Sequence, residues 1–318
     1  MEDVFVGIDV SKDRLDGCVR GGATFGHDNS PAGIRRVTAL LRRRPVRLVV
    51  VEATGGLEVP LVRALQRAEV PVAVANPRQV RDFAKACGVL AKTDRLDAAV
   101  LAHFAEAVRP PARPLPDERT LLLDALLTRR HQLIDMRTME RNRLGQCPDP
   151  AVRDGIEEHL AWLQERIDEA DRGLGEAVAA DPDWQARDAL QRSVPGVGPV
   201  VSRTLLAGLP ELGRLGGKQL AALAGLAPFA DDSGRHRGRR RVCGGRSEVR
   251  AMLYMAALTA SRTGSPLGEL FRRLRARGKE FKVAVVAVAR KLLTIVNAVV
   301  RSGRAYDANG LQAACAAG

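Results

Sequence analysis

The first hundred residues alternate short apolar runs with amphipathic segments. Runs rich in β-branched residues predict strands at 4–10, 14–19, about 23–26, 46–53 and 70–75. Apolar residues at helical spacing predict helices at 32–43, 57–68, 77–87 and 94–108. Three successive strands followed by alternating helices and strands indicate an α/β domain with a mixed sheet over residues 1–108.

The pattern changes after a proline-rich segment, RPPARPLP at 109–116, which cannot continue a helix and is typical of a boundary. From 117 to 179, apolar residues spaced by threes and fours predict two long helices broken near 147–150. We expect a proline linker and a coiled-coil arm over 109–180, although an ordinary helical bundle fits the same pattern. A mainly α-helical domain is predicted over 181–305, followed by a flexible tail at 306–318.

Charge is distributed unevenly along the 318 residues. The formal net charge is +13, and between residues 230 and 304 eighteen Lys or Arg stand against five Asp or Glu, an excess of thirteen. The remainder of the chain is balanced, so all of the excess lies in one C-terminal block. A basic block of this kind indicates an anionic partner, with nucleic acid first among the candidates.

Other global features favour a protein of the reducing cytoplasm. The five cysteines show no spacing typical of a zinc site or a disulfide framework. The first residues predict a strand, and no export signal is visible there. The most apolar stretch, 281–300, contains Lys282, Arg290 and Lys291, which predicts a buried helix with no role in spanning a membrane.

Four acidic residues stand where predicted elements begin or end. Asp9 ends the first strand, Glu52 ends the central strand, and Asp94 and Asp97 share one face of the helix that they open. Each acid alone also fits a surface charge or a helix cap. Together they predict a site for one or two Mg²⁺ ions, with Mn²⁺ as an alternative, that supports phosphoryl transfer. Three nearby acids fit solvated strand edges or turns better: Asp13, Asp16 and Glu58.

Two features of the predicted helical domain over 181–305 point to nucleic acid. Gly196 and Gly198 lie between apolar helical stretches and predict a helix-hairpin-helix-like turn whose N–H groups face a phosphate, although a plain turn between helices is the alternative. A run of arginines follows Ser233 and Gly234, and from composition alone this serine fits a cap or turn residue better than a nucleophile. The candidate contacts to phosphates are Arg235, Arg237, Arg239, Arg240, Arg241, Arg246, Arg272, Arg273, Arg275, Arg277, Lys279 and Lys282.

These motifs together resemble the DEDD transposases of the insertion-sequence one-ten family, relatives of the pilin-gene invertase. The resemblance spans nearly the whole chain, and the segments that carry it are VGIDVSKDRLD, VVVEATGG, ANPRQVRDFAKACGVLAKTDRLDAAVLAHFA, PGVGPV and GLAPFADDSGRHRGRRRVCGGRSEVRAMLYMAAL. It implies a RuvC-like domain of RNase H fold, with the DEDD acids at Asp9, Glu52, Asp94 and Asp97. It further implies that Ser233 is a nucleophile that links covalently to DNA.

The resemblance also implies partners. Family members recognise donor and target DNA through a structured noncoding bridge RNA, and their subunits form dimers that assemble into tetramers. The metal-binding acids and Ser233 would then form one composite site when the two domains meet.

Three other functions fit parts of the sequence. A RuvC-like junction endonuclease would use the four acids for hydrolysis, with Ser233 only binding phosphate. A tyrosine recombinase would use the His236-x-x-Arg239 pattern and Tyr254, although the apolar stripe over 248–260 predicts that Met252, Tyr254 and Met255 belong to the core. A non-catalytic nucleic-acid-binding scaffold would need none of the acids.

Overall fold

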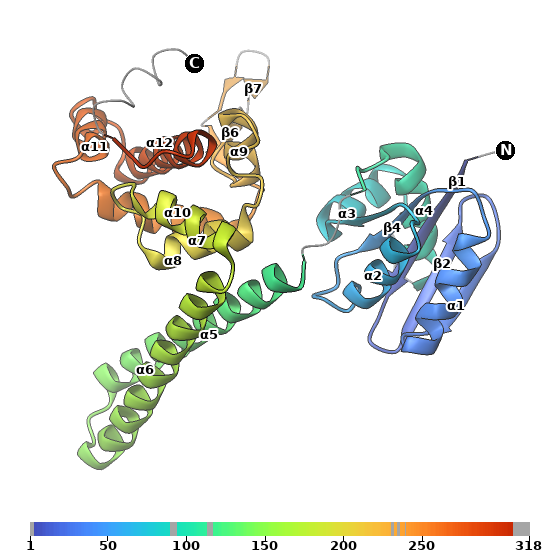
Figure 1. Ribbon diagram of the computed structural model, residues 1–318, viewed down its shortest axis with the longest axis horizontal. Coiled ribbons are helices and arrows are strands. Elements are labelled where there is room, and N and C mark those ends of the chain that lie inside the picture. The colour runs from blue at the N-terminus through green and yellow to red at the C-terminus, as the bar shows by residue number, and fades with distance from the viewer. Residues whose placement is uncertain are drawn as a thin grey trace. The chain divides into compact units, whose positions relative to one another are not determined.

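The computed structural model describes residues 3–89, 94–112, 117–229, 232–233, 236–238 and 240–307, with the backbone alone for 94–96, 232–233 and 236–237. The chain divides into two compact units, Met1–Pro116 and Asp117–Gly318. Figure 1 shows that the first unit is built on a β-sheet and that the second is dominated by helices. Each unit is described below by itself.

The first unit contains a five-stranded mixed sheet, as the sequence predicts. Its strands lie in the order β3-β2-β1-β4-β5. β1 pairs with β2 and β2 with β3 in antiparallel fashion, whereas β1, β4 and β5 run parallel. The strands are β1 (Val4–Val10), β2 (Arg14–Val19), β3 (Thr24–Asp28), β4 (Val46–Glu52) and β5 (Val72–Ala75).

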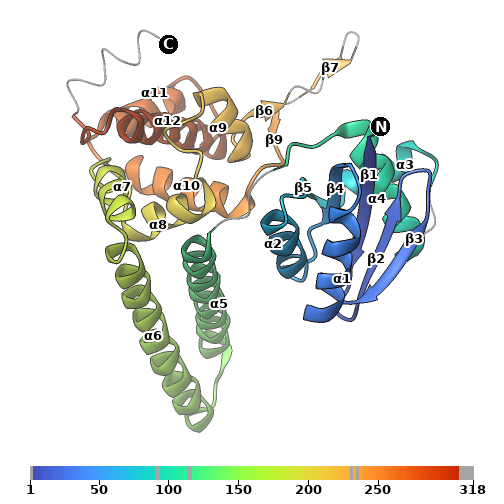
Figure 2. The ribbon, with the colours of Figure 1, turned by 45° about the vertical axis from the view of Figure 1, so that its right-hand side comes forward.

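Four helices cover the two faces of this sheet: α1 (Pro31–Arg42), α2 (Val59–Arg67), α3 (Pro77–Ala86) and α4 (Asp94–Val108). Because side chains alternate along a strand, Val6 and Ile8 of β1 point to one face, where they pack with residues of α1 and α2. Phe5 points to the other face, where it packs with residues of α3 and α4. Figure 2 shows α1 and α4 on opposite sides of the sheet.

The second unit begins with a helical arm made of α5 (Glu118–Gln146) and α6 (Pro150–Ala179). The break between the helices is fixed by Asp149, whose carboxylate accepts hydrogen bonds from the N–H groups of Ala151 and Val152 and so caps α6. Arg130 of α5 donates two hydrogen bonds, 2.6 and 3.0 Å long, to the carboxylate of Asp171 on α6. This fork ties the helices together near the base of the arm.

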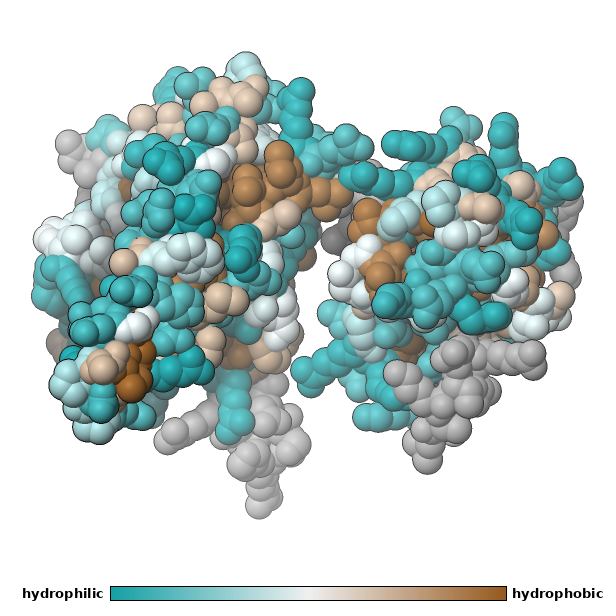
Figure 3. All heavy atoms as spheres, turned by 90° about the horizontal axis from the view of Figure 1, so that it is seen from below, coloured by the Kyte–Doolittle hydropathy of each residue, from teal (hydrophilic) through white to brown (hydrophobic). Residues whose placement is uncertain are grey.

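Several large apolar side chains on the arm face away from its internal seam. The buried seam includes Leu133, Leu163 and Ile167. On the outside, the surfaces of both units are largely hydrophilic with hydrophobic patches (Figure 3). The exposed apolar residues of the arm, with between 38% and 57% of their surface accessible, are Leu122, Met136, Met139, Val152 and Trp162.

Six further helices form the body of the second unit: α7 (Pro182–Arg192), α8 (Pro199–Gly208), α9 (Gly217–Leu223), α10 (Ser247–Ala260), α11 (Pro266–Ala276) and α12 (Phe281–Ser302). They enclose one core, to which α12 contributes Val285, Val288, Leu292 and Val296 among others. In the described part of the chain, α12 alone is long and apolar enough to cross a membrane. More than half of its most apolar stretch is buried, as expected of a helix in the core of a folded domain.

Two short β-ribbons interrupt the helices, and the sequence pattern did not predict them. β6 (Pro228–Phe229) pairs with β9 (Arg241–Val242), and between them β7 (Asp232–Ser233) pairs with β8 (His236–Arg237). Strands of two residues are too short to show alternation, and β8 and β9 also lie within a basic run.

Candidate active site

Asp9 and Glu52 lie at the carboxyl ends of two neighbouring parallel strands. β1 pairs with β4 in a register that places Ile8 beside Val51. The next residues along the two strands are therefore Asp9 and Glu52, and both are half-buried. The two carboxylates consequently start from adjacent positions at one edge of the sheet, where open α/β sheets gather functional groups.

Both acids also project from the same face of the sheet. Side chains alternate along a strand, so Asp9 shares a face with Phe5, and Glu52 shares a face with Leu48 and Val50. These three apolar residues belong to the core that α3 and α4 close. On each strand, the acid therefore follows a row of apolar side chains, and it lies where the face covered by α3 and α4 ends.

Helix α4 runs antiparallel to β1 across this face. The guanidinium of Arg109, just beyond the end of α4, lies 5.3 Å from the ring centre of Phe5. Two residues further along β1, Gly7 lies against Ala98 and Ala102. Moving along β1 toward Asp9 therefore means moving back along α4 toward its first turn.

The remaining two acids lie in that first turn. Two strand residues beyond Gly7 advance about 6.6 Å, which corresponds to about four helical residues at about 1.5 Å each. The stretch of α4 opposite Asp9 is therefore centred on about residue 96, between Asp94 and Asp97. The side chain of Asp94 lies outside the described residues, and Asp97 is half-buried.

An ion pair holds the other end of α4 to the sheet. Arg20, which follows β2, donates from Nε to Oε2 of Glu106 on α4 at 2.6 Å. This hydrogen bond from Arg20 lowers the pKa of the Glu106 carboxyl below its ordinary value, and electrostatic interactions with the guanidinium groups of Arg20 and Arg109 add to the effect. Because both partners are substantially exposed, the pair orients α4 more than it stabilises the fold.

The loop that follows Glu52 is organised by Glu58, an acid that the sequence interpretation assigned to a solvated edge or turn. Glu58 is only 8% exposed, so the solvated part of that interpretation is wrong. Its Oε2 accepts hydrogen bonds from the backbone N–H and hydroxyl of Thr54, at 3.1 and 3.2 Å, and from the N–H of Gly56 at 2.9 Å. The signal available in the sequence was the turn GG at 55–56, because an acid two residues further on can accept from the N–H groups of such a turn.

A further acid lies beside Asp9 on the other side of β1. The register of β1 and β2 places Asp16 directly opposite Asp9. The Asp16 carboxylate accepts a hydrogen bond of 3.1 Å from Nη2 of Arg14, with which it forms an ion pair. Asp16 is therefore a neighbour of the acidic edge whose charge is already balanced.

The donor set at this edge suits hard divalent cations, because carboxylate oxygens are the ligands that Mg²⁺ and Mn²⁺ prefer. Among the side chains that the structure describes, no three carboxylate, histidine or cysteine groups already form a cluster that could hold an ion. Asp94, the fourth acid of the set, is not among them. The argument for a metal site here therefore rests on the positions and the carboxylate oxygens of Asp9, Glu52 and Asp97.

In the second unit, Ser233 belongs to a narrow two-stranded ribbon. It is the last residue of β7 and pairs with His236 of β8. Figures 1 and 2 show β7 away from the helices of its unit. The side chains of Ser233, His236 and Arg237 are not described, and Gly234, Arg235 and Arg239 lie outside the described residues.

The other basic candidates fall into two groups. Arg240 and Arg241 are exposed beside and on β9, and an exposed basic cluster surrounds the turn between α11 and α12: Arg272, Arg273, Arg275, Arg277, Lys279 and Lys282. Arg246 differs from them, because it donates 2.6 and 2.7 Å hydrogen bonds to both carboxylate oxygens of Glu211 and a 3.0 Å bond to the carbonyl of Gly208. Its guanidinium is engaged in holding α10 to the α8–α9 loop.

The turn between α7 and α8 uses its two glycines differently. Gly196 has a positive φ of 92°, and a Cβ at this position would lie 2.9 Å from the Cβ of Ala260 on α10. Gly198 caps α8, is exposed and has open space where a side chain would be. Gly196 is therefore needed for the turn and for packing, while Gly198 leaves the first N–H groups of α8 accessible.

Comparison with known proteins assigns both ends of the chain to one family. Residues 6–148 match the DEDD transposase family of IS110 elements, described as "Transposase", and residues 188–272 match the "Transposase IS116/IS110/IS902 family". The chain belongs to the IS110 family of transposases. In this IS110 chain the first match contains Asp9, Glu52, Asp94 and Asp97, and the second contains Ser233.

Individual relatives of this IS110 chain agree with the assignment. The pilin gene-inverting proteins of Moraxella bovis and Moraxella lacunata are each 27% identical over 322 residues, which cover 96% of this chain and 98% of each relative. A 44.8 kDa protein of the insertion element IS116 from Streptomyces clavuligerus is 32% identical over 149 residues, 46% of this chain and 36% of that protein.

Three residues of α10 that were predicted to belong to the core, including the Tyr254 of the tyrosine-recombinase hypothesis, have mixed surroundings in this IS110 chain. Tyr254 and Met252 are partly buried and pack against the core of the second unit. Met255 is 55% exposed, so the prediction that it belongs to the core is wrong. Helix α10 has more apolar residues than its buried face holds, so its apolar composition overestimated how many of its side chains are buried.

Proposed function

We propose that this protein is a DNA recombinase that cuts and rejoins DNA strands through metal-dependent phosphoryl transfer. The observation that carries the proposal is the position of Asp9 and Glu52 on one face, at the carboxyl ends of adjacent parallel strands, with the first turn of α4 opposite them. The order β3-β2-β1-β4-β5, with three antiparallel strands and two parallel ones added, supports a RuvC-like domain of RNase H fold.

Asp9, Glu52, Asp94 and Asp97 are proposed to hold one or two Mg²⁺ or Mn²⁺ ions. When bound, such ions stabilise the negative charge that develops on phosphodiester oxygens and lower the pKa of an attacking hydroxyl. The protein residues supply the carboxylates, keep them from moving apart by packing α4 against β1, and fix the loop after Glu52 through Glu58.

Ser233 is proposed as the nucleophile. Its Oγ would form a bond to phosphorus while the bond from phosphorus to a deoxyribose oxygen breaks, and the serine proton would end on that leaving oxygen. A hydroxyl of the partner strand then reverses the exchange, which rejoins DNA without an external energy source. A position on a narrow ribbon among arginines supports this role, because guanidinium groups balance charge on a phosphate.

The DNA contacts are proposed to come from the second unit. Donors to phosphates are offered by the arginine run at 235–241, in which Arg240 and Arg241 are exposed, by the cluster between α11 and α12, and by the N-terminus of α8 after a helix-hairpin-helix-like turn. Recognition of donor and target DNA is proposed to use a structured bridge RNA, as the family implies. We further propose that the exposed apolar residues of the arm pair with a second copy, giving dimers that assemble into tetramers.

The metal site is tested by titrating Mg²⁺ into the whole protein and measuring heat and thermal stability. Asp9→Asn and Glu52→Gln should remove both the binding heat and the Mg²⁺-dependent rise in Tm, and should abolish recombination of a plasmid carrying the element ends. Asp13→Asn, which removes an exposed acid from the same unit, serves as the matched control. Full recombination in both acid variants would point to a nucleic-acid-binding scaffold.

The serine is tested by trapping protein bound covalently to DNA under denaturing conditions. Ser233→Ala should lose the adduct, while Ser247→Ala, a nearby exposed serine at the start of α10, should keep it. If DNA is cut but no adduct forms in the unaltered protein, the four acids catalyse hydrolysis, and a RuvC-like junction endonuclease becomes the better description.

A further inference from the structure

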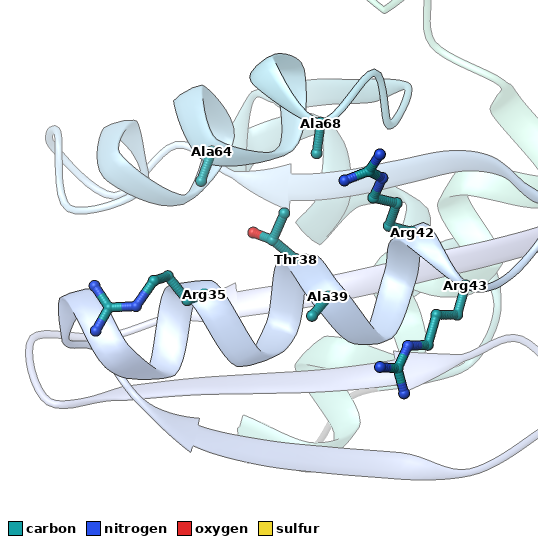
Figure 4. Close-up of a pocket in the computed structure, with 7 residues that line it drawn as sticks. All are labelled: Arg35, Thr38, Ala39, Arg42, Arg43, Ala64 and Ala68. Atoms are coloured by element: carbon teal, nitrogen blue, oxygen red, sulfur yellow. The ribbon is translucent and has the colours of Figure 1, made fainter.

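A groove of about 550 Å³ lies between α1 and α2 in the first unit. It is lined by Arg35, Thr38, Ala39, Arg42, Arg43, Ala64 and Ala68. Figure 4 shows Thr38 and Arg42 pointing from α1 toward α2, while Arg35 and Arg43 extend from the two ends of α1. The groove is thus an apolar trough with guanidinium groups at its ends.

The charge on the α1 side of this groove is one-sided. Residues 29–51 contain six arginines and no acidic residue. Arg35, Arg42 and Arg43 are all exposed. Within the parts of the chain that the structure describes, no ion pair joins any of the three to a carboxylate. Three uncompensated guanidinium groups around one hollow attract an anion.

The other lining residues make the guanidinium groups the main polar feature of the groove. Ala39, Ala64 and Ala68 are small, and this leaves room between the helices. The hydroxyl of Thr38 donates a 2.8 Å hydrogen bond to the carbonyl of Ile34 in its own helix. An occupant would therefore rest apolar parts on the alanines and place its negative charges at the arginines.

This groove is separate from the acidic edge. Helices α1 and α2 pack with Val6 and Ile8 on one face of the sheet, whereas Asp9 and Glu52 project from the other face. A ligand in the groove would consequently not reach the carboxylates of the same unit. Its role is binding, away from the chemistry.

We propose that the groove between α1 and α2 binds the phosphodiester backbone of a nucleic-acid strand. Arginine matches phosphate oxygens with two parallel N–H donors, and sugar carbons suit an alanine floor. The inference rests on the proposed function only in taking nucleic acid as the anionic partner. It adds a second contact surface to the C-terminal basic block, on the unit that holds the acids.

The test compares two triple variants of the full-length protein that remove the same charge from the same region. The groove variant is Arg35→Gln/Arg42→Gln/Arg43→Gln, and the control is Arg36→Gln/Arg44→Gln/Arg47→Gln, three exposed arginines outside the groove. Binding of single-stranded RNA and single-stranded DNA of one sequence is measured over a range of salt concentrations. Thermal melting confirms that both variants are folded.

The groove variant should bind at least one of the two strands about tenfold more weakly than the control does. Its plot of log affinity against log salt should also be shallower by about 2, because each lost phosphate contact on a single strand contributes roughly 0.7 to the slope. The strand that loses more affinity identifies the source of the backbone. Equal losses in both variants, or none, would overturn the proposal.

The outcome is separable from that of the proposed function. Asp9→Asn tests the catalytic proposal by its loss of recombination, whereas the two arginine triples, which leave all four acids in place, are compared by strand binding. If Asp9→Asn recombined normally, the catalytic proposal would fail and the comparison of the two arginine triples would still decide the groove.

Discussion

Gly7 of β1 and Ala98 of α4 are in direct backbone contact. A Cβ added at Gly7 would lie 2.3 Å from the carbonyl oxygen of Ala98 and 2.2 Å from the backbone nitrogen of Ala102. Helix α4 can approach the strand this closely only because Gly7 has no side chain. The contact lies two residues from Asp9 and one residue from Asp97, so it sets the distance between the strand and helix that carry the acids.

Gly7→Ala should therefore displace α4 and reduce Mg²⁺ binding and recombination without altering an acidic residue. The added methyl group meets backbone atoms that cannot rotate away, and overpacking of this kind destabilises a fold by about 1–3 kcal/mol. Chemical denaturation measures the loss. Gly22→Ala is the matched control, since an added Cβ there would lie 3.4 Å from its nearest neighbour, Val19. Similar stability and Mg²⁺ affinity in both variants would argue against this role for Gly7.

Glu58→Ala should weaken the site through the loop that follows Glu52. The change leaves the N–H groups of Thr54 and Gly56 without their acceptor, which destabilises the fold by about 1–3 kcal/mol. Because Glu58 positions the loop and is not proposed to touch the ion, the Mg²⁺ concentration for half-maximal activity should rise roughly 10–100-fold.

Glu58→Gln separates positioning from a general loss of folding. Its amide oxygen can still accept from the loop, so most of the Mg²⁺ affinity should return. If Glu58→Gln behaved like Glu58→Ala, a role for the negative charge itself would replace the positioning role.

Asp16→Asn should have little effect on metal binding, although Asp16 stands directly opposite Asp9 on β2. Its carboxylate is paired with Arg14, so it adds little negative potential to the acidic edge. Calorimetry should show Mg²⁺ affinity within about threefold of the unaltered protein, whereas one missing metal ligand in Asp9→Asn should abolish binding. Equal losses in the two variants would place Asp16 among the ligands.

The sequence predicted the elements of the first unit and the order of its acids, because strand ends and helix starts are local signals. It could not predict the roles of Gly7 and Glu58. A missing side chain acquires meaning only when the opposing helix is known, and the burial of Glu58 depends on how the loop after Glu52 folds back. Met255 shows the converse limit, since an apolar residue on an apolar helix proved to be exposed.

Lowering the pH should destabilise the junction between the arm and the helical body, because Asp181, which caps α7, becomes protonated. Its carboxylate accepts from the N–H of Trp184, and Arg119 of α5 donates to it at 2.8 Å. The backbone hydrogen bond from Trp184, followed by that from Arg119, lowers the pKa of Asp181 below its ordinary value. A lowered pKa means that the ionised group stabilises the folded state above the usual carboxyl range, and that this contribution is lost as the pH falls through the lowered pKa.

Asp181→Ala should therefore lower Tm at pH 7, and the difference in Tm from the unaltered protein should narrow below about pH 4. Asp135→Ala, an exposed position on α5, should change Tm little, and a gap for Asp181→Ala that stayed constant from neutral to acidic pH would exclude the ionised cap as its cause.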